Sequence, residues 1–135
     1  MEKVINITIL IIWLSYMGLE GFREAFYWHF KNTSSDQSKY EIHPIFLSQR
    51  AFVFMIVSAF VISEPKASYY TLISCVICSP FIHNGMYYYV RNSIDGSYPK
   101  GFLDQSKTST AISTKFLTPI VRIGLFVVGI FLLIL

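Results

Sequence analysis

Long apolar stretches alternate with shorter polar ones along the chain. The apolar stretches cover residues of about 4–22, 45–63, 67–90 and 116–135. Each is close to the ~20 residues that an α-helix, rising ~1.5 Å per residue, needs to cross the ~30 Å hydrocarbon core of a bilayer. No stretch shows the strict apolar–polar alternation that is typical of a half-buried strand. The pattern predicts an all-α integral membrane protein with four transmembrane helices.

The connections between these stretches predict how the helices are arranged. Two polar loops, residues 31–44 and 91–115, alternate with the tight turn Ser63-Glu64-Pro65-Lys66. Connections of this length place successive helices side by side and antiparallel. We therefore expect one transmembrane domain over residues 1–135, an up-down-up-down four-helix bundle. Its third helix should be kinked at Pro80, which has no N–H to donate.

The composition agrees with a membrane protein and indicates which classes of partner to expect. Of the 135 residues, 53% are hydrophobic and only 14% are charged, which is too apolar for a soluble domain of this length. The formal net charge is +3, and the basic residues form no run that would follow a phosphate backbone. Membrane lipids are therefore expected partners, and nucleic acid is not.

The basic residues are divided unequally between the two sides of the predicted bundle. Lys3 and Lys66 belong to the side of the termini. The other nine of the eleven belong to the side of the two polar loops: Arg23, Lys31, Lys39, Arg50, Arg91, Lys100, Lys107, Lys115 and Arg122. Cytoplasmic loops of membrane proteins are enriched in Lys and Arg. We therefore expect both long loops to face the cytoplasm and both termini to face outward.

The end of the third apolar stretch carries a concentration of polar and aromatic residues. His83, Tyr87 and Arg91 follow one another at intervals of about one helical turn and so share a stripe. Asn84 and Tyr88 share the adjacent stripe. We predict a ligand-binding pocket at the cytoplasmic interface, with these candidates: Arg50, Arg91, Asn84, Tyr87 and Tyr88. The arginines would hold an anionic head group. An ordinary aromatic belt at the headgroups is the alternative explanation.

Histidine and carboxylate side chains are predicted at the same cytoplasmic interface. Such groups can together bind a divalent metal or act as general acid and base. The catalytic candidates are His83, His43, Glu24 and Glu20. The metal-ligand candidates are His83, His43 and His29. No H-E-x-x-H, H-x-x-H or E-x-x-H spacing occurs, so interfacial histidines and ordinary ion pairs explain the same residues. The sequence determines no cofactor; a divalent metal is a candidate, and its identity stays open.

Glu20 lies within the first apolar stretch, which is a costly place for a carboxylate. An ionisable side chain at the centre of a transmembrane helix costs ~2.5–3.5 kcal/mol on insertion scales. Arg50 and Arg122 are expected at a similar depth on the second and fourth helices. We therefore expect Glu20 to face the interior and to pair with one of them. Such a pair would either fix helix packing or belong to a binding site.

The third helix contains the motif Cys75-Val76-Ile77-Cys78. A C-x-x-C pair in a predicted four-span bundle resembles the quinone-linked, disulfide-forming membrane oxidoreductases such as the vitamin K epoxide reductase family, which implies a reactive disulfide. The chain departs from that pattern because the pair lies inside the apolar stretch and no second cysteine pair exists. We therefore expect both cysteines to be buried, reduced and dispensable.

Two functional hypotheses from different classes remain. In the first, the protein is an interfacial binder or a metal-assisted enzyme that acts on an amphipathic, lipid-like ligand. In the alternative, it is a non-catalytic membrane subunit that packs against a larger membrane protein or another copy of itself. A small transporter or pore is third, because no polar line crosses the full depth of any predicted helix. Convergence of the polar residues on one site would favour the first hypothesis.

Overall fold

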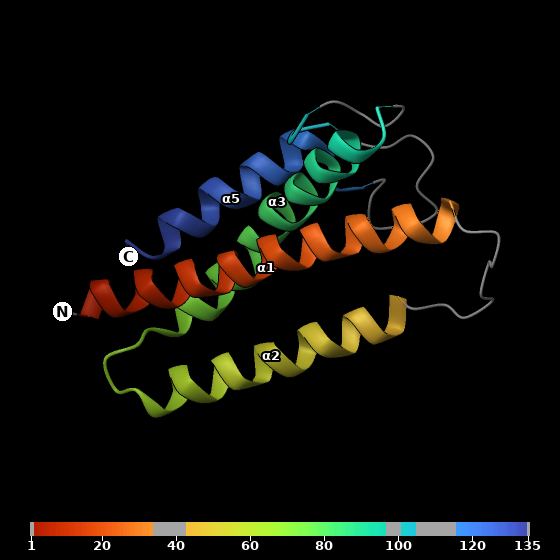
Figure 1. The fold of residues 1–135 in the computed structure, drawn as a ribbon. Helices are drawn as coiled ribbons and strands as arrows, with labels where there is room; N and C mark the ends of the chain where they lie inside the picture. Colours follow the sequence, from red (N-terminus) through yellow and green to blue (C-terminus); the bar gives the residue numbers. More distant parts are fainter. Residues whose placement is uncertain (1, 34–42, 97–100, 105–115, 135) are drawn as a thin grey trace.

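The structure is a computed structural model that describes residues 2–33, 43–96, 101–104 and 116–134. Within these residues the chain forms four helices and no strand: α1 (Glu2–Thr33), α2 (His43–Ser63), α3 (Tyr69–Ile94) and α5 (Pro119–Leu132). The all-α class predicted from the sequence is therefore confirmed. Figure 1 shows the helices running roughly along one direction, with both termini and the α2–α3 connection at the same end.

Two of the helices are long and apolar enough to cross a membrane. They are Glu2–Lys31 and Ile45–Ser63, whereas α5 is a shorter apolar helix. Only 11% of the candidate span in α2 is buried inside the protein. Several of its large side chains, among them Phe52 and Met55, are more than half exposed. By length and composition, the described residues thus contain two candidate membrane-spanning helices.

The prolines lie where the backbone tolerates them, with one exception. Pro44 falls in the first turn of α2, and Pro119 is the first residue of α5, positions at which the missing N–H has no helical partner to lose. The hydroxyl of Thr118 caps α5 by accepting from the Val121 N–H at 3.4 Å. Helix α3, by contrast, continues as one assigned helix through Pro80.

Helices α1 and α3 pack backbone to backbone at Gly21. A Cβ atom at this position would collide with the backbone carbonyl oxygen of His83. One turn earlier, a Cβ at Gly18 would lie 3.5 Å from Cγ2 of Ile82, an ordinary contact. The close approach at Gly21 therefore brings the polar residues that flank it on α1 next to those of α3.

Towards the termini, the same two helices are joined by an apolar core. The core consists of Ile9, Leu10, Trp13, Met17, Val61, Cys75 and Cys78. Trp13 is also hydrogen-bonded, since its Nε1–H lies 2.9 Å from the Cys75 carbonyl oxygen and 2.7 Å from Ser79 Oγ. Helix α5 packs on the other side of α3, where the Ser74 hydroxyl donates to the Gly129 carbonyl at 2.8 Å. The core thus joins α1 and α3, with Val61 contributed by α2, and α5 is held to the far side of α3.

Candidate functional site: a charge network shared by three helices

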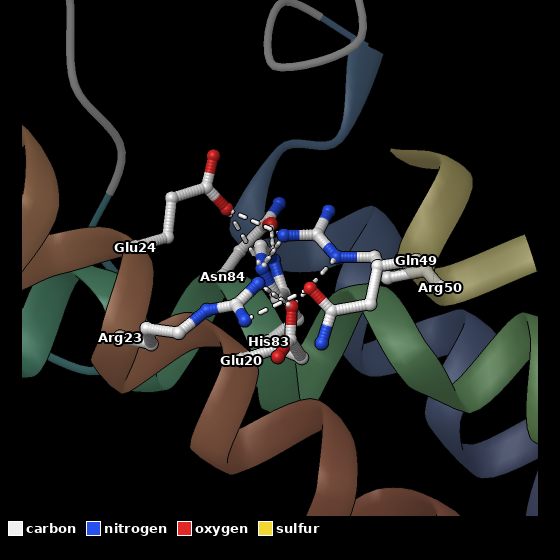
Figure 2. A network of polar contacts seen from close by, with 7 residues as sticks. All are labelled: Glu20, Arg23, Glu24, Gln49, Arg50, His83 and Asn84. Atoms are coloured by element: carbon white, nitrogen blue, oxygen red, sulfur yellow. Dashed lines mark hydrogen bonds and ion pairs between the residues drawn. The ribbon is translucent and has the colours of Figure 1, made fainter. Parts of the chain in front are cut away.

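Seven polar side chains from three helices point toward one another in the half of the bundle away from the termini (Figure 2). We call them the charge network: Glu20, Arg23 and Glu24 from α1, Gln49 and Arg50 from α2, and His83 and Asn84 from α3. The α1 members are spaced three and four residues apart, so they lie on one side of that helix. The network thus links the α1–α3 pair to α2.

Glu24, Arg50 and His83 form the centre of the charge network. Oε2 of Glu24 accepts from Nη2 of Arg50 at 2.6 Å and lies 3.0 Å from Nε2 of His83. Nη2 of Arg50 is also 2.7 Å from Nε2 of His83. A carboxylate, a guanidinium and an imidazole from three different helices are therefore within mutual hydrogen-bond range (Figure 2).

Glu20 occupies the second part of the charge network. Nη2 of Arg23 donates to Oε2 of Glu20 at 2.8 Å, and Nε of Arg50 lies 3.8 Å from the same oxygen. Arg23 also donates from Nη1 to Oε1 of Gln49 at 2.9 Å. The expected pairing of Glu20 with Arg50 is present, but a shorter pair forms with Arg23 on the same helix.

Arg122, the other partner expected for Glu20, binds backbone carbonyls instead. It is completely buried on α5. Its guanidinium donates to the carbonyl oxygens of Phe102, Leu103 and Asp104 at 3.4, 2.7 and 3.0 Å, respectively. Backbone carbonyls are a common partner for a cation inside a membrane protein. Of the two partners expected for Glu20, the structure therefore supports Arg50 and not Arg122.

The charge network has a buried side and an open side. Glu20, Glu24 and His83 are only 5%, 8% and 9% exposed. The side chains of Arg23 and Arg50, by contrast, are 42% and 22% exposed. An isolated buried carboxylate would be costly, so the guanidinium groups stabilise the two glutamates where they are. The same guanidinium groups are accessible from outside the bundle.

His83 can take two hydrogen-bond arrangements within the charge network. Its Nδ1 lies 3.1 Å from Oδ1 of Asn84, so an Nδ1–H can donate to that oxygen. In the neutral ring Nε2 then carries a lone pair, which accepts from Arg50. In the protonated ring Nε2–H donates to Glu24 instead. The site can therefore hold a proton at Nε2 or release it, which is the acid–base chemistry available here.

The donor set of the charge network does not fit a metal ion. Protein zinc sites use at least three protein ligands. Among the described residues, no three His, Cys, Asp or Glu side chains are grouped to hold one ion. Between Glu24 and His83, the place of a cation is taken by the Arg50 guanidinium. His29 packs its ring against Phe30 at 5.6 Å, and the side chain of His43 lies outside the described part of the chain.

The remaining ligand-binding candidates lie further along α3. Arg91 and Tyr88 are buried, at 1% and 4% exposure. The Tyr88 ring contacts that of Tyr87 at 5.2 Å and lies 5.9 Å from the guanidinium carbon of Arg122. Tyr88 therefore lies at the α3–α5 interface. The structure thus brings together five of the predicted site residues: Glu20, Glu24, Arg50, His83 and Asn84.

Three further residues belong to this region although the sequence analysis did not select them. The sequence contains a signal for Arg23, because a cation three residues after Glu20 can form an ion pair with it on the same helix. It contains none for Gln49, since a single amide near a helix start is common. Tyr16 lies one turn before Glu20, and its buried hydroxyl has no hydrogen-bond partner in the described part of the chain.

Cys75 and Cys78 are free and buried, as the sequence predicted. Both belong to the apolar core, and the thiol of Cys78 lies 3.6 Å from the carbonyl oxygen of Phe126. Neither cysteine contributes to the charge network.

Comparison with known proteins assigns no family to the chain. No protein-family model, curated protein or solved structure matches it.

Proposed function

We propose that the chain is a multi-pass membrane protein whose four helices cross the bilayer as an up-down-up-down bundle. The exposed apolar surface supports this: besides that of α2, α5 presents Ile120, Val127 and Phe131 at 82%, 60% and 59% exposure. A soluble protein rarely leaves continuous apolar faces in contact with water. A kink of α3 at Pro80 belongs to the same proposal. Pro80 has no N–H to donate to the Val76 carbonyl four residues before it, so one bond of the helix is missing at this point.

The orientation in this proposal follows the basic residues. The end that carries the charge network faces the cytoplasm, because nine of the eleven Lys and Arg residues belong to that side. A reporter fused after Leu135 should then read as external, and one inserted beside Ser35 as cytoplasmic. The reverse reading would contradict the orientation without affecting the geometry of the network.

In this proposal, the charge network binds the polar head of an amphipathic ligand from the bilayer. The observation that supports it is the convergence of five ionisable side chains from three helices on one partly open site. Ionisable groups inside membranes are expensive and usually serve function. His83 would provide a hydrogen-bonding and proton-holding nitrogen, Glu24 would orient it, and the two arginines would face the ligand.

Native mass spectrometry of the detergent-solubilised protein tests this function. The wild type should retain a lipid-like molecule, and His83→Gln should retain about tenfold less, since one hydrogen bond is worth about 0.5–1.5 kcal/mol. Lys66→Gln, at the other end of the bundle, is the control and should behave as the wild type. Melting temperatures of all three proteins separate lost binding from lost folding. Equal retention by His83→Gln and the wild type would contradict the proposal.

The alternative, a non-catalytic subunit, is favoured by a different observation. Helix α2 is held by the charge network and a few apolar contacts, while most of its surface is uncovered. In that case a larger membrane protein or a second copy would cover α2. Cross-linking from Phe60, which is 54% exposed on α2, would then give a defined protein adduct in native membranes. Cross-links to lipid alone would favour the ligand-binding function.

A further inference from the structure

We infer that the head recognised by the charge network is uncharged and carries a carbonyl oxygen, as a carboxylic ester or a quinone does. The carbonyl would accept hydrogen bonds from the Tyr16 hydroxyl and from the Nε–H groups of Arg23 and Arg50. This inference rests on the proposed function and specifies the chemical class of its ligand.

The first observation is a surplus of buried donors. Nε of Arg23, Nε of Arg50 and the hydroxyl oxygen of Tyr16 are buried and have no hydrogen-bond partner in the described part of the chain. A buried donor without an acceptor typically costs about 1–3 kcal/mol, so native proteins rarely retain one without a reason. Three such donors in one region indicate an acceptor that comes from outside the described part of the chain.

The second observation is that the side chains carrying the three donors belong to the region around Glu20. Arg23 and Arg50 both approach its Oε2, at 2.8 and 3.8 Å. Tyr16 precedes Glu20 by one helical turn and Arg23 by two, so the three side chains share a side of α1. The three donors therefore belong to one region of the protein, in which the inferred acceptor would lie.

The third observation is the charge balance of the charge network. Two carboxylates, Glu20 and Glu24, already balance the two guanidinium groups of Arg23 and Arg50. An anionic head would bring a further negative charge beside Glu20, which opposes its binding. A cationic or donor-only head would leave the three donors unsatisfied. An uncharged acceptor fits both the charge and the hydrogen bonds, and a carbonyl oxygen is such an acceptor.

Access from the bilayer is consistent with this ligand. The side chains of Arg23 and Arg50 are partly exposed, and Tyr16 is half-buried. The Tyr16 ring lies 5.6 Å from that of Trp13, so a chain bound here would pass close to an indole. Trp13 can therefore report binding through its fluorescence.

The experiment uses dibrominated stearyl chains that differ only in their heads. The 135-residue chain, as Trp28→Phe so that Trp13 is its one tryptophan, is reconstituted in nanodiscs of ether-linked phosphatidylcholine, which has no ester carbonyl of its own. Quenching of Trp13 is titrated with the methyl ester, the free acid and the amine at about pH 9, where the acid is ionised. We expect saturable quenching by the ester, half-complete at a concentration about tenfold below that needed for either charged chain. A tenfold difference corresponds to the contribution of about one hydrogen bond. Competition by an unbrominated long-chain ester or a long-chain quinone distinguishes the two carbonyl sources.

A matched pair of tyrosine variants tests the binding atoms. Tyr16→Phe removes one unpartnered oxygen, so it should weaken ester binding about tenfold without lowering the melting temperature. Tyr69→Phe makes the same change at a side chain that is 71% exposed at the other end of α3, and it should bind as the wild type. Arg23→Lys, which keeps the charge but loses the Nε donor, should also weaken ester binding.

The outcomes separate this inference from the function on which it rests. Tighter binding of the acid or the amine, or ester binding unchanged in Tyr16→Phe, would overturn the carbonyl assignment while leaving an amphipathic ligand in place. No saturable quenching by any of the three chains would contradict the proposed function as well.

Discussion

Helices α1 and α3 are held together in two different ways along their length. Near the termini, Trp13 packs into an apolar core and donates to Cys75 and Ser79 of α3. Near the other end, Gly21 lets the backbones touch and Glu24 reaches across to His83. The apolar core of the first half contains no charged side chain, whereas the second half is stable only if each charge keeps its partner. A single substitution should therefore be tolerated differently in the two halves.

The largest effect is expected where a charge loses its partner. Glu24→Ala leaves Arg50 and His83 without the carboxylate they share, and breaking a buried ion pair in this way costs about 3–5 kcal/mol, toward the lower end here because Arg50 is partly exposed. The free energy of unfolding in detergent measures the loss. Glu64→Ala, in the turn after α2, is the matched control and should cost less than about 1 kcal/mol. Similar losses in the two variants would show that the network is fully solvated.

The second effect concerns the close approach of the backbones. Gly21→Ala places a Cβ against the His83 carbonyl oxygen, so α1 and α3 must separate at a cost of about 1–3 kcal/mol. Gly124→Ala, at a position with no atom within 4 Å of the added Cβ, is the control and should be neutral or slightly stabilising because alanine favours helix. A Gly21→Ala protein that melts as the wild type would show that the helices do not touch there.

A smaller loss of stability is expected in the half that is joined by the apolar core. Trp13→Phe keeps an aromatic ring in the core but removes the donor shared by the Cys75 carbonyl and Ser79, which should cost about 1–2 kcal/mol. Trp28→Phe, which loses an indole 4.9 Å from the Lys31 ammonium, should cost less than about 1 kcal/mol. Thermal melts of both variants check the order. If Trp28→Phe lowered the melting temperature more than Trp13→Phe, the contacts that stabilise α1 most would lie near Trp28 and not in the apolar core.

The smallest effect is expected at the two cysteines. Each behaves as a small buried apolar side chain, so Cys75→Ala and Cys78→Ala should cost about 1 kcal/mol each. Retention of the ligand, measured by native mass spectrometry, should not change in the double variant. If the double variant folds but no longer retains ligand, the redox interpretation of the C-x-x-C motif becomes the better one.

The sequence predicted the helices better than the contacts between them. Hydrophobic stretches and prolines place helices at about the right residues because apolar length and the missing N–H of proline act locally. Glu20 could be recognised as a residue that needs a partner, since its cost depends only on its depth. The three-residue spacing is enough to predict an ion pair between Glu20 and Arg23. The additional pairing with Arg50 could not be predicted without knowing that α2 approaches the same face of α1.

What the sequence determined by itself is the all-α class, the positions of the helices and the set of polar residues concentrated toward one end. These depend on the composition and spacing of neighbouring residues. Only the tertiary structure decided which of those residues meet, because the rotation of each helix about its axis is fixed by contacts such as Gly21 against the His83 backbone. That rotation turned Tyr88 toward Arg122 on α5 and His83 toward Glu24 and Arg50. The charge network therefore depends on packing between distant segments, for which one sequence carries no local signal.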